Sequence, residues 1–139
     1  MRYWLMKSEP DTWGWDHQAA RGSTGAEWHG VRNYQARNNM RQMQLGDRAF
    51  FYHSNVGKEI VGIIEVIARS HPDSTTEDPR WDCVDVRALQ KLERAVSLEV
   101  CKADPRLANM VLVNNTRLSV QPVTDDEWRV VCSLGGIDG

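Results

Sequence analysis

Runs of apolar residues with a strand-like period alternate along the chain with shorter helix-like segments. Strands are predicted over 2–6, 48–53, 60–69, 81–88 and 117–121. Short helices are predicted over 16–20 and 124–135, the second opened by a T-x-x-E capping box, and 97–104 is predicted to be a short helix or a turn. Because strands and helices do not alternate regularly, the pattern favours an α+β fold: a small mixed β-barrel of about five to six strands with flanking short helices. No repeat or linker divides residues 1–139, so we expect a single domain.

The stretch 28–55 carries the densest mixture of polar and aromatic residues. A helix is predicted from about Val31 to Met43, with Ala36, Met40 and Met43 spaced i, i+4, i+7 as its core face. Asn33 lies beside that face, so we expect its amide to be half-buried. A Gly46-Asp47 turn leads into the strand 48–53, where alternation sends Phe51 and His53 to one face and their neighbours to the other.

Two segments after this stretch have their own signals. Gly62 lies inside an otherwise apolar strand, which marks a bulge or a close approach of backbone or ligand. The Pro-, Asp- and Thr-containing segment 71–80 is long enough to be a flap.

Composition narrows the class of protein. The 139 residues, 41% hydrophobic and 26% charged, can bury most of their own apolar surface. A net charge of −2 excludes a binder that depends on phosphate neutralisation alone, so any nucleic-acid contact needs a local basic patch. Cys83, Cys101 and Cys132 lack metal-site spacing, which predicts buried free thiols in a reducing compartment and no metal.

The apolar run at the N-terminus is too short for a signal sequence or a membrane span. We therefore expect a soluble cytoplasmic protein without membrane contact. No motif for a cofactor is present, and we favour a monomer.

Six long segments resemble, in order, the motifs of the EVE domain family. They are YWLMKSEP, WHGVRNYQARNNMR, GDRAFFYHSN, VGIIEV, HPDST and RLSVQPVT. The resemblance covers nearly the whole chain. The EVE family is similar in fold to PUA, ASCH and YTH domains, so the resemblance implies a PUA-like barrel that binds nucleic acid carrying a modified base, such as a modified cytosine or another methylated base in DNA or RNA.

Reading a modified base requires aromatic faces beside polar groups, because the base must leave the stack and be held by its edge. Trp28 and Trp81 stand in places similar to the cage tryptophans of YTH domains, although six Trp in this chain mean that most are packing residues. Trp4, Trp13, Trp15 and Trp128 are assigned to the core. We expect Trp28 and the strand end 51–55 to line a pocket with the Ser8-Glu9 loop at its rim.

The remaining candidates are assigned by chemistry. Base-edge and pocket candidates are Ser8, Glu9, Asn33, Phe51, Tyr52, His53, Ser54 and Asn55. Asn33 could instead cap the helix, and His53 could be an interior histidine. Phosphate candidates are Lys7, Arg32, Arg37, Arg41 and Arg117. The alternative for the Arg37 and Arg41 stripe is a solvated helix surface.

Two other classes of function stay open. ASCH relatives include hydrolases of modified nucleosides, and Lys7, Ser8, Glu9 and His53 offer a base, a nucleophile and an acid. Ser8, however, points away from its neighbours on an extended strand and has no oxyanion motif, so we expect no enzyme. A small-molecule or protein-binding module is supported only by the acidic charge balance.

Overall fold

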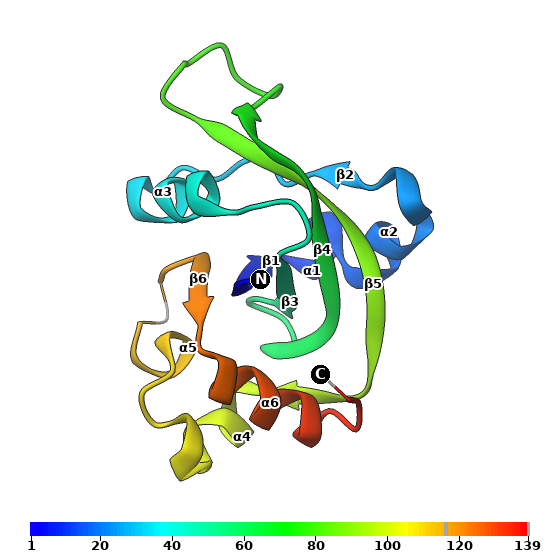
Figure 1. The fold of residues 1–139 in the computed structure, drawn as a ribbon, viewed down its shortest axis with the longest axis vertical. Helices are drawn as coiled ribbons and strands as arrows, with labels where there is room; N and C mark the ends of the chain where they lie inside the picture. Colours follow the sequence, from blue (N-terminus) through cyan, green and yellow to red (C-terminus); the bar gives the residue numbers. More distant parts are fainter. Residues whose placement is uncertain (116, 139) are drawn as a thin grey trace.

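The computed structural model describes residues 1–115 and 117–138, which form one curved mixed sheet with short helices around it (Figure 1). The sheet has six strands in the order β2-β5-β4-β3-β1-β6. The strands are β1 (Tyr3–Ser8), β2 (Ala26–Glu27), β3 (Arg48–His53), β4 (Glu59–Pro72), β5 (Asp82–Ser97) and β6 (Val120–Val123). The helices are α1 (Pro10–Trp13), α2 (Trp15–Ala20), η1 (Gly22–Thr24), α3 (Tyr34–Gln42), α4 (Leu98–Ala103), η2 (Pro105–Leu107), α5 (Val111–Asn114) and α6 (Asp125–Leu134). The predicted α+β class is confirmed.

The strands β3, β4 and β5 form an antiparallel meander, and β2 adds to the outer edge of β5. β1 pairs in parallel with β3 and antiparallel with β6, which makes the sheet mixed. Several register shifts interrupt the pairing of β4 with β5, and such bulges bend a strand. Within the described residues β2 and β6 end the sheet without pairing to each other, so hydrogen bonding leaves it open rather than closed as a barrel.

Two hydrophobic cores lie on opposite faces of the sheet, because successive strand residues point in opposite directions. Phe51 lies in the core that contains Ala36 and Met40 of α3, hereafter the α3-side core. Phe50 and Tyr52 lie in the core that contains Trp128 of α6, hereafter the α6-side core. Figure 1 shows α3 on one side of the curved strands and α4, α5 and α6 on the other. The predicted division of strand 48–53 into two faces is confirmed.

Helix α3 begins at Tyr34, later than the predicted Val31. Asn33 has an extended backbone, and its side-chain oxygen accepts a hydrogen bond from the Ala36 amide at 2.9 Å. Asn33 is therefore the N-cap, and Val31 is buried in the extended segment before it. Ala36, Met40 and Met43 are all buried, as predicted.

The predicted strand over 117–121 is displaced in the structure. β6 spans Val120–Val123 and contains Pro122, which was expected to follow the strand. Proline is tolerated there because β6 is an edge strand, paired within residues 1–115 and 117–138 with β1 alone. The strand predicted from Trp81 begins at Asp82 and is longer than expected. The capping box of α6 is present as predicted.

The three cysteines Cys83, Cys101 and Cys132 are free and buried, as predicted. Among the described residues, no helix has both the length and the apolarity needed to cross a membrane.

Candidate functional site

A hollow of about 540 Å³ opens where β1 ends, next to α1 and the segment that carries β2. We call it the Trp28 pocket. Its volume falls in the range of roughly 300–1,000 Å³ that is typical of ligand sites. The lining residues are Lys7, Ser8, Glu9, Thr12, Trp13, Arg21, Ala26, Glu27, Trp28, His29 and Gly30.

The end of β1 supplies the polar rim of the Trp28 pocket, as the sequence predicted for Ser8 and Glu9. The Ser8 hydroxyl donates to the Trp13 carbonyl at 2.5 Å, which ties the strand end to α1. Lys7 is half-buried, and burial lowers the pKa of its ammonium group. The Lys7 Nζ atom lies 5.7 Å from the centroid of the Tyr52 ring.

Trp28 forms the inner wall of the pocket. Its side chain is only 6% exposed and packs edge-to-face on Phe51, with ring centroids 5.3 Å apart. Its backbone amide donates to the Val84 carbonyl of β5 at 2.7 Å, which continues the pairing of β2. Trp28 is therefore a packing residue of the α3-side core that also borders a cavity. The role predicted for it, as a wall of a base-binding cage, needs such a cavity beside the ring.

Trp13 is the second aromatic residue of the pocket, and it also packs against the α3-side core, in line with its assignment to the core from the sequence. It is half-buried, and its indole N–H donates to the Gln18 side chain at 3.0 Å. Gln18 is fully buried and in turn donates to the Val86 carbonyl of β5 at 3.1 Å. This relay fixes the indole at the pocket. No strand or helix period marked Trp13, because it lies in the four-residue helix α1.

The strand end 51–55 does not line the Trp28 pocket, contrary to prediction. Phe51 is fully buried behind Trp28, and Tyr52 faces the α6-side core. His53 accepts a hydrogen bond from the Trp15 amide at 3.1 Å and lines a second hollow of about 450 Å³. Burial lowers the pKa of His53, with Glu59 and Asp16 opposing that shift. His53 is therefore half-buried beside the second hollow rather than interior, with its ring held by the Trp15 amide.

Ser54 and Asn55 form the turn after β3. The Ser54 amide donates to the Ser8 carbonyl at 2.9 Å, so this turn is joined to the β1 end by backbone. Asn55 is exposed and has a φ of 64°, in the left-handed region that asparagine tolerates better than most residues. Neither residue lines the pocket.

Trp81 is also outside the Trp28 pocket, so the predicted pair of walls from Trp28 and Trp81 is not assembled. The Trp81 ring stacks on Tyr34 at 5.0 Å, and the Arg32 guanidinium lies 5.7 Å from its centroid. These contacts tie the start of β5 to the beginning of α3.

Asn33 is exposed rather than half-buried, and its side chain caps α3. Replacing Asn33 with alanine is expected to lower the free energy of unfolding by about 1 kcal/mol, the usual cost of losing an N-cap. Asn33→Asp keeps a capping oxygen and should retain most of the stability. Urea denaturation measures the free energy of unfolding of both variants. Equal stability of wild type and Asn33→Ala would contradict the capping role.

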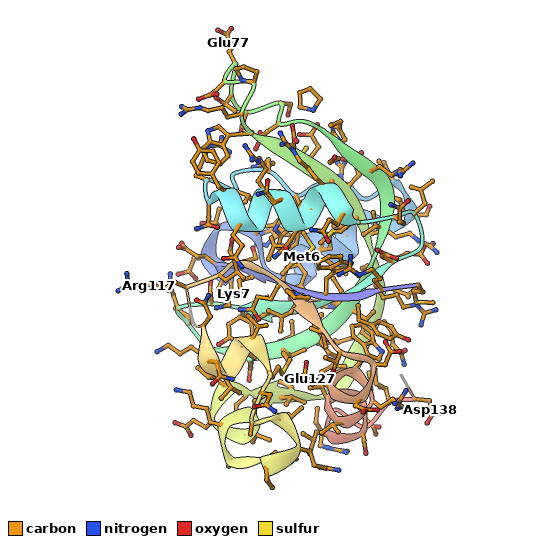
Figure 2. The ribbon with its side chains drawn as sticks, turned by 60° about the vertical axis from the view of Figure 1, so that its left-hand side comes forward. Met6, Lys7, Glu77, Arg117, Glu127 and Asp138 are labelled. Atoms are coloured by element: carbon orange, nitrogen blue, oxygen red, sulfur yellow. The ribbon has the colours of Figure 1, made fainter. Side chains whose placement is uncertain are left out.

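Three of the arginines predicted to meet phosphate, Arg32, Arg37 and Arg41, have partners for their side chains in the structure. Arg32 pairs with buried Asp73 at 3.1 Å, and Arg41 pairs with Asp82 at 2.5 Å. Arg37 donates to the Arg80 carbonyl at 3.0 Å. The Arg37 and Arg41 stripe on α3 therefore contacts residues at the start of β5 and just before it. The two interpretations from the sequence were a solvated helix surface and a phosphate-binding patch, and neither included these contacts. Arg117 is exposed and projects from the body of the protein (Figure 2). Phosphate binding by these residues stays a prediction.

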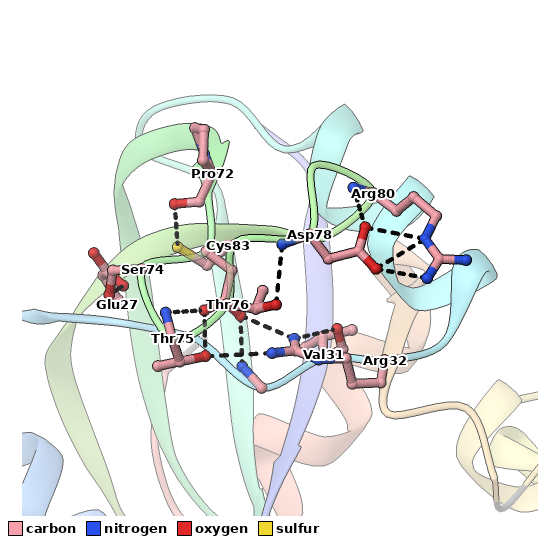
Figure 3. A network of polar contacts seen from close by, with 12 residues as sticks. Glu27, Val31, Arg32, Pro72, Ser74, Thr75, Thr76, Asp78, Arg80 and Cys83 are labelled. Carbon is pink, nitrogen blue, oxygen red and sulfur yellow. Dashed lines mark hydrogen bonds and ion pairs between the residues drawn. The ribbon is translucent and has the colours of Figure 1, made fainter.

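The predicted flap is anchored to the segment that carries Trp28 (Figure 3). Asp73 is buried at the base of the loop that follows β4, whose tip is marked by Glu77 (Figure 2). Its carboxylate accepts hydrogen bonds from Thr75, the Gly30 amide at 2.8 Å and Arg32. Burial alone would raise the pKa of Asp73, but these hydrogen bonds outweigh it and hold the pKa far below its usual range. The pocket wall at Gly30 thus depends on an ionised Asp73.

The family model of the EVE domain matches residues 2–134 of this chain. This chain belongs to the EVE domain family. This EVE domain is 37% identical to mouse thymocyte nuclear protein 1 over 164 aligned residues, which cover 95% of this chain and 73% of the mouse protein. The crystal structure of Atu2648 from Agrobacterium tumefaciens is 59% identical, with a TM-score of 0.97, and the match covers 99% of this chain and 94% of that one.

Two solved complexes resemble this EVE domain. The human THYN1 protein in complex with DNA that contains 5-methylcytosine is 34% identical, with a TM-score of 0.89 and full coverage of both chains. The YTH domain of the Zygosaccharomyces rouxii MRB1 protein, in complex with N6-methyladenosine RNA, is 17% identical, with a TM-score of 0.60 and coverage of 99% of this chain and 88% of that one. The second likeness is one of fold alone, and it confirms the predicted YTH-like fold.

Proposed function

We propose that this EVE domain binds nucleic acid and recognises a modified base, with 5-methylcytosine in DNA as the first candidate. The observation that carries the proposal is the Trp28 pocket: two tryptophans border a hollow of ligand size whose rim is polar. The human THYN1 complex with 5-methylcytosine DNA supports the choice of ligand, because its chain matches this one over its full length.

The lining residues offer the contacts that a cytosine needs. Carboxylates can accept hydrogen bonds from the cytosine N4 amino group, and Glu9 and Glu27 supply two. Lys7 and Arg21 supply donors for the base carbonyl or for phosphate. The indoles of Trp13 and Trp28 supply apolar surface for the ring and its methyl group.

The methyl group by itself gives modest discrimination. Burying one methyl-sized group contributes about 0.8 kcal/mol, which corresponds to roughly a fourfold preference. Stacking of a base on an aromatic side chain contributes more, about 1–3 kcal/mol. We therefore expect stacking to hold the base in the pocket and the methyl contact to adjust the preference.

The direct test is a titration of fluorescent duplex DNA, with and without 5-methylcytosine, measured by anisotropy. Trp28→Ala is a poor probe, because removing a buried tryptophan costs about 3–5 kcal/mol of stability. Trp28→Phe keeps a buried ring but withdraws part of the indole from the pocket. We expect it to weaken binding of methylated DNA by about 5- to 30-fold, within the range of a stacking contact, and to lower the preference for methylated over unmodified DNA.

The matched control is Trp81→Phe, which changes a half-buried tryptophan outside the Trp28 pocket and should leave binding unchanged. Trp13→Ala should act like Trp28→Phe. If both pocket variants fold and keep the wild-type affinity and preference, the Trp28 pocket is not where the base binds.

We further propose that binding occurs without turnover. In support, the Ser8 hydroxyl donates to the Trp13 carbonyl, and His53 accepts from the Trp15 amide beside a different hollow, so the groups considered for a hydrolase do not converge on one pocket. Chromatography of modified nucleosides after incubation with the protein tests this point. Release of a free base or a demodified nucleoside would contradict it.

A further inference from the structure

Four potential metal ligands converge on one face of the sheet, beside the Trp28 pocket. They are Glu27 of β2, His71 of β4, and Cys83 and Asp85 of β5. Each offers one ligand atom, and these four atoms all lie within 4.8 Å of one another. The His71 Nε2 atom is 2.8 Å from the Asp85 carboxylate and 3.7 Å from the Cys83 sulfur.

Strand register explains the convergence. Cys83 and Asp85 are two residues apart on β5, so their side chains point to the same face. His71 of β4 is the cross-strand partner of Cys83, and Glu27 of β2 is the partner of Asp85 on the other side. Three adjacent strands thus hold an array of four donors made of two cross-strand pairs, His71 with Cys83 and Glu27 with Asp85. The neighbouring residues Val84 and Val86 point the other way, into the α3-side core.

The end of β4 and the start of the loop after it lie beside Glu27 and Cys83 (Figure 3). Ser74 donates to the Glu27 carboxylate at 2.6 Å, and the Cys83 sulfur lies 3.9 Å from the Pro72 carbonyl. Cys83 is fully buried, whereas the side chains of His71 and Asp85 are 34% and 32% exposed. A small cation can therefore reach the array from solvent while its sulfur ligand stays protected.

We propose that Glu27, His71, Cys83 and Asp85 form a zinc site that joins β2 to β4 and β5. Thiolate, imidazole and carboxylate are the three ligand types that Zn²⁺ accepts, and four protein ligands make a closed structural site. In a tetrahedral site the ligand atoms lie about 3.3–3.8 Å apart, given metal–ligand distances of about 2.0–2.3 Å. The array needs only small side-chain shifts to reach that spacing.

The charge balance also favours a cation. The site brings two carboxylates, Glu27 and Asp85, together with a thiol that binds Zn²⁺ as the thiolate, so binding displaces one proton from Cys83 to solvent. The imidazole binds in its neutral form, and the two carboxylates bind as anions. The resulting site combines a divalent cation with three anionic ligands.

Metal binding in this array would act on the neighbouring pocket through Glu27. Glu27 lines the Trp28 pocket and directly precedes Trp28. Coordination through one carboxylate oxygen would fix β2, which directly precedes the pocket wall at Trp28, and would leave the other oxygen available to the pocket. The zinc site does not require that the pocket bind a base.

The test uses the full chain, stripped of metal with a chelator and dialysed. We expect one equivalent of Zn²⁺ to bind per chain and to raise the Tm by about 5–10 °C at roughly 100 times its Kd, whereas Mg²⁺ should have little effect because thiolate is a soft ligand. Co²⁺ should give a thiolate charge-transfer absorption. Cys83→Ser and His71→Gln should each abolish the absorption and most of the Tm shift, while Cys101→Ser, which changes another buried thiol, should keep both.

Failure of wild type to bind one equivalent of Zn²⁺ would overturn the proposal. So would a cobalt spectrum and Tm shift that persist in both Cys83→Ser and His71→Gln. If Cys83→Ser does not fold, His71→Gln decides the matter, because its side chain is partly exposed. Loss of metal binding with unchanged DNA binding would separate this site from the proposed function.

Discussion

Replacing Asp47 with alanine is expected to lower the free energy of unfolding by about 3–4 kcal/mol. Asp47 directly precedes β3, and its side chain is 2% exposed. Its carboxylate accepts hydrogen bonds from the Arg2 amide at 3.0 Å, the Trp4 indole at 3.1 Å and the Gln44 amide at 3.0 Å. Hydrogen bonds to a charged group contribute about 1.5–3 kcal/mol each, and their losses are not fully additive. Urea denaturation monitored by tryptophan fluorescence measures the change.

Two variants control for this result. Asp47→Asn keeps the shape and one accepting oxygen but places an amino group against donors, so its loss should be smaller than that of alanine. Asp126→Ala removes an exposed carboxylate that pairs with Arg129 on α6, and should change stability little. A midpoint for Asp47→Ala that equals the wild-type value would show that water replaces the carboxylate at this junction.

The second large effect is expected at Gly62, where an added Cβ atom would lie 2.3 Å from Cζ3 of Trp15. Trp15 is 6% exposed and packs edge-to-face on Phe51 at 5.6 Å, and Phe51 in turn supports Trp28. Overpacking a core costs about 1–3 kcal/mol, and the short contact with a buried indole places Gly62→Ala at the upper end, about 3 kcal/mol. Thermal and urea unfolding measure it.

A double-mutant cycle isolates the cause. Trp15→Phe removes the part of the indole that meets Gly62, so Gly62→Ala should cost much less in the Trp15→Phe background than in wild type. The coupling energy should reach about 2 kcal/mol, as for residues in direct contact. Equal costs in both backgrounds would place the destabilisation in the backbone of β4 rather than in the clash. The register shift between Ile60 and Gly62 makes that alternative concrete.

Most of the fold follows from local patterns in the sequence. The alternation in 48–53, the core stripe of α3 and the capping box of α6 each depend on neighbours in the chain, and each was predicted. The predicted ends of α3 and β6 were wrong because a single residue determines each of them. Asn33 ends the extended segment because its side chain caps α3, and Pro122 is accepted within β6 because that strand has a free edge.

The site was predictable only in part, because tertiary contacts decide which strand face meets which loop. Ser8, Glu9 and Trp28 lie together at one pocket as expected. Phe51 has an aromatic ring that could form a pocket wall, but Trp28 and Trp15 pack against that ring and separate it from the pocket. Trp13 gave no periodic signal in its short helix. The proposed zinc ligands could not be recognised in the sequence, because they come from three different strands. His71 lies beside Cys83 only through the register of β4 and β5.

The position of β1 in the sheet has a consequence for synthesis of the chain. The meander of β3, β4 and β5 can pair once residues up to Ser97 have left the ribosome. β1, made first, must then wait for β6, since Tyr3 pairs with Val123 near the other end of the chain. Until then one edge of β1 is open, and an open strand edge can pair with another chain. A nascent or truncated chain that ends before β6 is therefore the form of this protein most exposed to aggregation.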